Sequence, residues 1–226
     1  MKNITLLNKK FTMLILMLVL VFAFTFQIYA GDFPITVKDD LGHDVKIKEE
    51  PQRIISLAPS ITEMIYSIGL EDKVVGVTTY ADYPKKATKM TKIGSVTEPN
   101  IEKIISLKPD LVIAAEINKM STIKKLKKLN IKVAGFAPHS IKETINTLIK
   151  VGHVTGNEQK ARQVAASLRF KTDKIKELVQ KKLKNNSRPK VFYEIWSDPL
   201  MTAGEGTFID DIIRIAGGKN IGAQAK

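Results

Sequence analysis

Short apolar runs alternate with amphipathic helical stretches over most of the chain after residue 51. The apolar runs lack regular polar alternation, which is typical of strands that are buried on both faces. Predicted strands lie at residues 53–57, 73–77, 111–114, 132–136 and 190–195. Predicted helices lie at residues 60–68, 100–107, 121–129, 140–155 and 208–216, with a short helical turn at 84–87. This alternation predicts an α/β fold whose parallel sheet is covered by helices on both faces.

Two stretches depart from this alternation. Residues 34–48 alternate apolar and polar side chains on both sides of the sequence Asp39-Asp40-Leu41-Gly42, which predicts a β-hairpin with a short turn. Residues 157–186 contain neither Gly nor Pro and predict a single helix about 45 Å long. At the start of the 60–68 helix, Ser60 followed by Glu63 predicts an N-cap of the capping-box type.

These patterns divide the chain into regions. We expect a signal segment at 1–30, a hairpin lead-in at 31–50 and a Rossmann-like N-terminal α/β lobe at 51–156. A long connecting helix follows at 157–187, and residues 188–226 are expected to begin a second α/β lobe. One strand and one helix cannot bury a core of their own. Either this last region packs on the first lobe or, as we expect, the second lobe is truncated at its C-terminal side.

The first thirty residues have the pattern of a secretory signal. Residues 1–10 carry three lysines and no acid, residues 11–28 are almost entirely apolar, and Ala30 offers a small residue for cleavage. The apolar stretch of about 18 residues is also long enough to span a bilayer as an uncleaved anchor. The chain has no cysteine to accept a lipid. We expect an exported protein, periplasmic or at the cell surface, that needs no disulfide bonds.

The positive charge of the chain is concentrated in the predicted long helix. The 226 residues carry a formal charge of +13, and residues 157–188 contain ten basic and three acidic residues. Nucleic-acid binding would favour basic residues interleaved with aromatics, and only Phe170 interrupts this run. We interpret the run as a solvated helix face. A remote alternative is that this basic protein binds nucleic acid or a polymer of the cell envelope.

Residues that could support catalysis are few and scattered. His43, His139 and His153 are far apart, and without cysteine a zinc site is not expected. No serine lies in a G-x-S-x-G motif, and Gly204-Glu205-Gly206 is followed by Ile209 where a dinucleotide loop requires its third glycine. The sequence therefore favours a binding protein over an enzyme, with no metal and no resident cofactor.

Unusual residues follow the predicted strands, where an open parallel sheet binds its ligands. Pro59 and Ser60 follow the first strand, Tyr80 and Tyr83 follow the second, and Trp196 follows the strand after the long helix. The sequence Glu116-Ile117-Asn118 follows the third strand. Aromatic side chains with polar tips suit a broad, mostly apolar ligand. The alternative for each aromatic is that it only covers a hydrophobic core.

These segments carry a family resemblance. RIISLAPSITEMIYSIGL, VVGVTTYADYP and NIEKIISLKPDLVIA resemble the first lobe of the class III substrate-binding proteins of ABC importers, which take up cobalamin, haem or iron-siderophores. FYEIWSDPLMTAGEGTFIDDIIRIAGGKNIG resembles the start of the second lobe of the cobalamin-type members. The resemblance implies two α/β lobes joined by a long helix, and a second lobe that normally continues for several more elements.

The resemblance also implies partners and roles. A monomer would capture a metal chelate between its lobes and deliver it to an ABC permease in the membrane. Tyr80, Tyr83 and Trp196 would contact the ligand, and the loop at Pro59-Ser60 would supply backbone N–H donors. Glu102 occupies the place of the glutamate that pairs with permease arginines. We expect cobalamin as the ligand, with haem (for which Tyr80 or Tyr83 could bind iron) or a ferric siderophore as alternatives.

Overall fold

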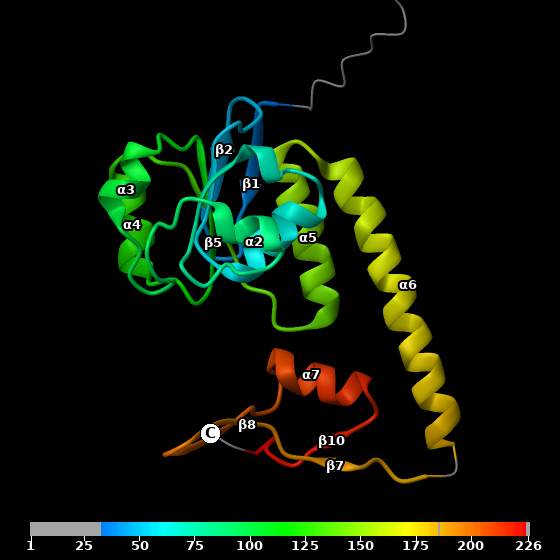
Figure 1. The fold of residues 1–226 in the computed structure, drawn as a ribbon. Helices are drawn as coiled ribbons and strands as arrows, with labels where there is room; N and C mark the ends of the chain where they lie inside the picture. Colours follow the sequence, from blue (N-terminus) through cyan, green and yellow to red (C-terminus); the bar gives the residue numbers. More distant parts are fainter. Residues whose placement is uncertain (1–32, 185, 225–226) are drawn as a thin grey trace, which may run out of the picture. The chain divides into compact units, whose positions relative to one another are not determined.

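The computed structural model describes residues 33–184 and 186–224 (Figure 1). The predicted signal segment at 1–30 lies outside the described residues. Within the described ranges, no helix is both long enough and apolar enough to cross a membrane.

A four-stranded parallel sheet forms the centre of the first lobe. Its strands are β3 (Ile54–Ser56), β4 (Val74–Val77), β5 (Leu111–Ala115) and β6 (Val133–Phe136), in the order β4-β3-β5-β6. Neighbouring strands are all parallel. The predicted α/β fold with a parallel sheet is confirmed.

Helices cover both faces of this sheet, because successive strand side chains point to opposite faces. Helices α2 (Pro59–Ser67) and α5 (Ile141–Thr155) pack on one face, while α3 (Ile101–Ser106) and α4 (Met120–Lys128) contribute to the core on the other. Short 3₁₀ turns lie at Glu71–Lys73 and Lys85–Lys89.

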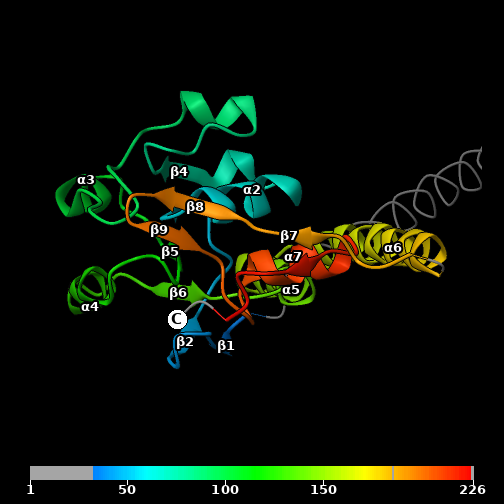
Figure 2. The same ribbon diagram turned by 90° about the horizontal axis from the view of Figure 1, so that it is seen from below.

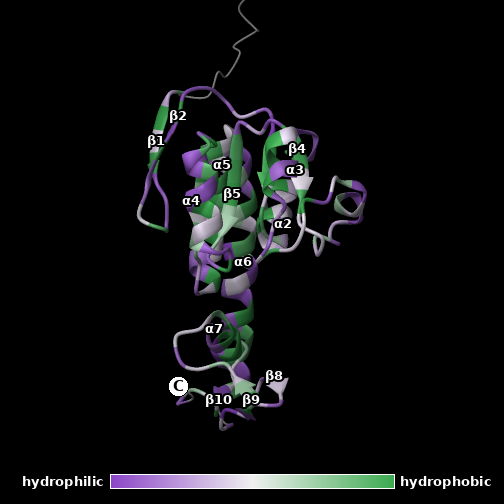
Figure 3. Cartoon of the chain, turned by 90° about the vertical axis from the view of Figure 1, so that its left-hand side faces the viewer, coloured by the Kyte–Doolittle hydropathy of each residue, from purple (hydrophilic) through white to green (hydrophobic). Residues whose placement is uncertain are grey.

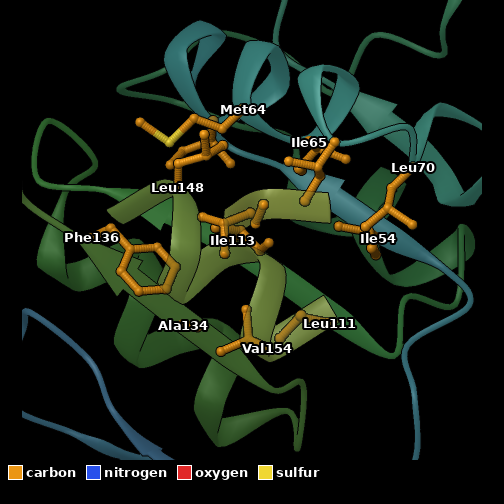
Figure 4. Packing of buried hydrophobic residues seen from close by; sticks show 14 of the residues in the cluster. Ile54, Met64, Ile65, Leu70, Leu111, Ile113, Ala134, Phe136, Leu148 and Val154 are labelled. Carbon is orange, nitrogen blue, oxygen red and sulfur yellow. The ribbon is translucent and has the colours of Figure 1, made fainter. Parts of the chain in front are cut away.

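Alternation along β5 shows how the two cores are supplied. Ile113 contributes to the core shared with α2 and α5, and the neighbouring Val112 contributes to the core shared with α3 and α4. Figure 4 shows Ile113 surrounded by Phe136, Leu148 and Met64. In Figure 3 strand β5 is mostly hydrophobic, whereas the long helix mixes hydrophobic and hydrophilic residues. The apolar runs of the sequence therefore end up inside, as buried strands.

An antiparallel pair precedes the sheet, where the sequence predicts a hairpin. Strand β1 (Ile35–Lys38) pairs with β2 (Asp44–Ile47). Asp39 in the turn is buried, and its carboxylate accepts hydrogen bonds from the backbone N–H of Leu41 at 3.1 Å, His43 at 2.7 Å and Gly135 at 3.1 Å. One side chain therefore shapes the turn and fixes it to β6.

The long helix α6 (Glu158–Leu183) has 26 residues and is close to the predicted range. Gly156, in a left-handed conformation with φ of 79°, ends α5 and turns the chain into α6. Ala161 and Ala165 are the buried residues of α6 and belong to the α2–α5 core. The first part of α6 is therefore packed on the first lobe.

We use the name C-terminal segment for residues 188–224. It contains β7 (Lys190–Val191), β8 (Glu194–Ser197), β9 (Leu200–Thr202), α7 (Phe208–Ile215) and β10 (Lys219–Asn220). Strand β7 pairs with β10 in parallel, and β8 pairs with β9 in antiparallel fashion. Figure 2 shows β8 beside β9. Helix α7 packs against β10.

The single strand predicted at 190–195 is wrong in its extent. The chain forms two short strands there, β7 and β8, which are separated by Phe192 and Tyr193. After β8 the chain turns at Asp198-Pro199, so that β8 pairs with β9 and not with a continuation of β7. The C-terminal segment contacts the rest of the chain through α7, which packs against α5 and α6. A Cβ atom on Gly217 would lie 2.7 Å from Cγ1 of Val179 in α6, so this contact is close.

Candidate functional site

A mostly apolar hollow lies where β5 and β6 end. Its volume is about 310 Å³. The residues that line it come from α2, the ends of β5 and β6, α5 and the start of α7: Ser60, Ile61, Met64, Ala115, Glu116, Ile117, Phe136, Ala137, Pro138, Thr144 and Phe208. The carboxyl ends of parallel strands are the expected place for a ligand. The hollow therefore is the candidate binding site.

The hollow has the chemistry of a site for an apolar ligand surface. Phe136 is buried in its floor at the end of β6, and Phe208 reaches it from α7. Polar groups are few: the hydroxyls of Ser60 and Thr144 and the carboxylate of Glu116. Few polar groups in an apolar pocket orient a ligand more than they attract it.

The structure corrects the predicted start of the helix at Ser60. Helix α2 begins at Pro59 with Ala58 as its N-cap, and no side chain makes a capping hydrogen bond. Proline is suited to the first helical position, because its fixed φ fits the helix and it has no N–H to satisfy. The expectation that Pro59 contributes a backbone N–H donor is therefore wrong, because proline has none. At the start of α2 the backbone N–H groups of Ser60 and Ile61 remain as donors.

The loop after β4 carries the two tyrosines, and they do not line the hollow. Tyr80 and Tyr83 are each 66% exposed. Nζ of Lys92 donates to the carbonyl oxygens of Ala81, at 2.8 Å, and Ala87, at 3.2 Å. These two hydrogen bonds fix the backbone of the loop. Burial lowers the pKa of Lys92, while nearby Asp82 partly opposes this shift. The loop is tethered, and its tyrosine side chains point into solvent.

Asn118 has a structural role that the sequence did not reveal. It is 5% exposed, and its Oδ1 accepts the backbone N–H of Ala115 at 2.8 Å. Its Nδ2 donates to the carbonyl oxygens of Leu57, at 2.9 Å, and Val96, at 2.8 Å. One amide therefore joins the chain segments that follow β3, β4 and β5.

A histidine and a carboxylate face each other at the edge of the hollow. Nε2 of His139 lies 3.6 Å from Oε2 of Glu116, and both side chains are exposed. The backbone N–H of His139 donates to Oε2 of Glu143 at 2.7 Å. In the sequence His139 is isolated from the other histidines, but it lies just after β6, at the end of a strand as Glu116 does after β5.

Two further predicted residues lie elsewhere. Trp196 is in β8 and is 63% exposed, with its Nε1 donating to the carbonyl oxygen of Asp198 at 2.9 Å. Glu102 is exposed in the first turn of α3. Among the predicted contacts only Ser60 lines the hollow. Sequence reasoning missed Phe136, Thr144 and Phe208, which only tertiary packing brings together.

A search for metal ligands gives no candidate in the described part of the chain. Residues 33–184 and 186–224 contain no group of three or more His, Cys, Asp or Glu side chains that could hold a metal ion.

Comparisons with known proteins agree with this architecture. A family model described as periplasmic binding protein matches residues 54–226. An uncharacterized ABC transporter substrate-binding lipoprotein of Bacillus subtilis, YvrC, is 39% identical over 196 residues, which are 84% of this chain and 62% of that protein. This chain therefore spans less than two thirds of the length of that relative.

Solved structures show the same fold. The periplasmic vitamin B12 binding protein BtuF of Vibrio cholerae is 30% identical, with a TM-score of 0.67 over 78% of this chain and 68% of that chain. A periplasmic haem-binding protein from Pseudomonas aeruginosa is 25% identical, with a TM-score of 0.70 over 75% of this chain and 62% of that chain. The family resemblance found in the sequence is confirmed: the chain belongs to the periplasmic binding protein family, whose members bind their ligands and are not enzymes.

Proposed function

We propose that this chain is the ligand-capturing part of an exported substrate-binding protein that delivers a metal chelate to an ABC permease. The observation that carries the proposal is the apolar hollow at the carboxyl ends of β5 and β6, with Phe208 of the C-terminal segment on its far side. A ligand held there would touch both the first lobe and the C-terminal segment. Binding, without any bond-making step, is the mechanism.

Roles follow from where each group lies. The backbone N–H groups of Ser60 and Ile61, at the start of α2, donate to polar groups at the edge of the chelate. Tyr80 and Tyr83, which are exposed on the loop after β4, would contact the part of the ligand that extends beyond the hollow. Trp196 stacks on the ligand from the C-terminal segment. A corrinoid or porphyrin suits this arrangement because it is too large to fit wholly inside a hollow of about 310 Å³, so part of its flat surface would extend out of it.

We propose cobalamin as the ligand, because the relatives include the vitamin B12 binding protein of Vibrio cholerae. Haem is the second candidate. It is favoured by the likeness to the Pseudomonas aeruginosa haem-binding protein and by two exposed tyrosines, whose phenolate oxygen can bind haem iron. A ferric siderophore would require cationic groups around the hollow, and its lining contains none.

A polymer-binding role is less well supported by the charges of α6. Several of its basic residues pair with acids one helical turn away, including Lys181 with Glu177 at 2.8 Å and Lys174 with Glu177 at 3.0 Å. These pairs reduce the charge that a phosphate backbone would meet. A polymer binder would also lose affinity steeply as salt is raised. Chelate binding should change little with moderate salt.

Glu102 is proposed as a docking contact for the permease. It is exposed at the start of α3, where a carboxylate is free to meet an arginine of a partner. Exposed charge pairs of this kind steer and orient docking more than they add affinity. We expect Glu102→Lys to lower chelate uptake by cells while chelate affinity in solution stays unchanged. Glu63→Lys, at an exposed position of α2, is the control and should leave uptake unchanged.

The direct test is a titration of the purified protein with cobalamin, haem and a ferric siderophore. Equilibrium dialysis measures bound chelate without the optical interference that these ligands cause. Saturable binding of one of the three, insensitive to moderate salt, supports the proposal and names the ligand. A cooperatively folded protein that binds none of them would contradict it.

A further inference from the structure

A buried carboxylate in α7 has no part in ligand contact. Asp211 is 7% exposed. Its Oδ2 accepts the backbone N–H of Ile141, the first residue of α5, at 2.9 Å, and its Oδ1 pairs with Arg214 of its own helix. A buried charge is tolerated when it is paired and hydrogen-bonded, and here one of its partners belongs to the first lobe.

The bond links the C-terminal segment to the first lobe. Ser140 caps α5 with its side chain on the N–H of Glu143, so the N–H of Ile141 is left for another acceptor. Asp211 supplies that acceptor from α7. A negative charge at a helix N-terminus is also favoured by the helix dipole.

The same two helix faces reach the hollow. Phe208 lies three residues before Asp211 on α7, and Thr144 lies three residues after Ile141 on α5. Residues three apart lie on one face of a helix. Phe208 and Thr144 both line the hollow, so the Asp211–Ile141 bond lies one helical turn from it.

We infer that Asp211 is a positioning residue that fixes α7 on α5 and thereby sets Phe208 against the ligand. The inference rests on the proposed function only where ligand affinity is concerned. The effect of the Asp211–Ile141 hydrogen bond on the movement of the C-terminal segment does not depend on a ligand, and it can be measured in the free protein.

The test removes each partner of the bond in turn. Asp211→Ala removes the acceptor, and Ile141→Pro removes the donor. Proline fits here because Ile141 is the first helical residue and Ser140 before it is extended, with ψ of 162°. Asp211→Asn keeps a side-chain oxygen that can accept the N–H of Ile141, so the position of α7 should stay as in the wild type. Asp173→Asn is the control: Asp173 is a residue of α6 that lines, together with Ile141 and Asp211, a groove between α5, α6 and α7.

The readout is the distance between the two parts of the molecule. The chain has no cysteine, so Lys124→Cys in α4 and Glu205→Cys, both at exposed positions outside the hollow, give a single labelled pair for pulsed electron resonance. We expect Asp211→Ala and Ile141→Pro each to broaden the distance distribution at least twofold. The double variant should broaden it no further, because the two changes break one bond. Asp173→Asn should match the wild type.

A second measurement uses the ligand. Asp211→Ala should bind the chelate at least fivefold more weakly, and Asp211→Asn should bind it within twofold of the wild type. Unchanged distances in both Asp211→Ala and Ile141→Pro would overturn the inference, as would equal broadening by Asp173→Asn. If no chelate binds the wild type, the distance measurement still decides the positioning role, so the two proposals fail separately.

Discussion

The first lobe and the C-terminal segment start from similar sequence and reach different ends. Both contain short apolar strands followed by helices. In the first lobe Ile113 of β5 is 0% exposed, whereas in the C-terminal segment Ile195 of β8 is 48% exposed. The large apolar side chains of this segment that are exposed are Phe192, Tyr193, Ile195, Trp196, Leu200, Met201, Phe208, Ile212 and Ile221.

The difference lies in the second covering layer. The four-stranded sheet has helices on both faces, so its side chains are buried whichever way they point. In the C-terminal segment, the antiparallel pair β8–β9 that carries Ile195 and the parallel pair β7–β10 are each only two strands wide. Helix α7 packs beside β10, and no described helix makes an extensive contact with β8 or β9. Parallel strands are normally buried on both faces. A buried strand thus needs its neighbours as much as its own apolar sequence.

The largest expected effect comes from matched isoleucines. Ile113→Ala should lower the free energy of unfolding by about 2–5 kcal/mol, because it leaves a cavity in a closed core. Ile195→Ala should change it by no more than about 0.5 kcal/mol, since about half of this residue is already exposed to water. Urea denaturation followed by circular dichroism measures both. Equal losses would mean that the C-terminal segment has a closed core after all.

The next effect concerns how the C-terminal segment is held on α6. Gly217 has φ of 89°, and an added Cβ would meet Val179 at 2.7 Å, so Gly217→Ala should cost about 2–4 kcal/mol from strain and overpacking together. Gly206 has φ of 77° with open space around it, so Gly206→Ala should cost only about 1 kcal/mol from strain. Amide hydrogen exchange in α7 reports both. Similar exchange rates in the two variants would show that α7 does not depend on the contact with α6.

A smaller effect is expected for the ligand contact of the C-terminal segment. Trp196→Ala should weaken chelate binding by more than about 1 kcal/mol, because the indole would lose its contact with a flat ligand. Trp196→Phe keeps an aromatic ring and should retain most of the affinity. Equilibrium dialysis with both variants measures the difference, and an unchanged affinity in Trp196→Ala would remove this residue from the site.

The smallest effect lies at the junction of α5 and α6. Burial alone would raise the pKa of Glu158, but hydrogen bonds from Arg162 and His153 outweigh it and lower the pKa. The stabilisation is therefore present above the unfolded value of 4.5 and is lost as the pH falls through the lowered value. Glu158→Gln should cost at most about 1 kcal/mol at pH 7, because solvent screens this site. Urea titrations at pH 7 and pH 3 should show a larger difference between Glu158→Gln and the wild type at pH 7 than at pH 3.

The sequence predicts the first lobe well because its signals are local. Apolar runs mark β3, β5 and β6, and the lack of Gly and Pro marks α6. The helices predicted from residues 100 and 140 begin one residue later as α3 and α5, with Asn100 and Ser140 as their N-caps. It fails at residues 190–202, where the turn at Asp198-Pro199 makes a hairpin out of a stretch that also suits a single strand.

The site is less predictable than the fold. Strand-end reasoning finds Ser60 and Glu116, since both follow directly from the position of a strand. It cannot find Phe208, because the contact of α7 with α5 depends on the packing of segments far apart in the sequence. Asn118 likewise shows its role only when the carbonyls of Leu57 and Val96 are brought beside it.

If the hollow between β5, β6 and α7 holds the ligand, a side chain that fills the hollow should block binding. Ser60→Trp places a large side chain at an exposed helix position that lines the hollow, and Ser106→Trp places the same side chain at an exposed position of α3 outside it. Chelate affinity would be measured by equilibrium dialysis on both variants after their melting curves are shown to match the wild type. We predict that Ser60→Trp abolishes saturable binding and Ser106→Trp retains it. Full affinity in Ser60→Trp would contradict the account.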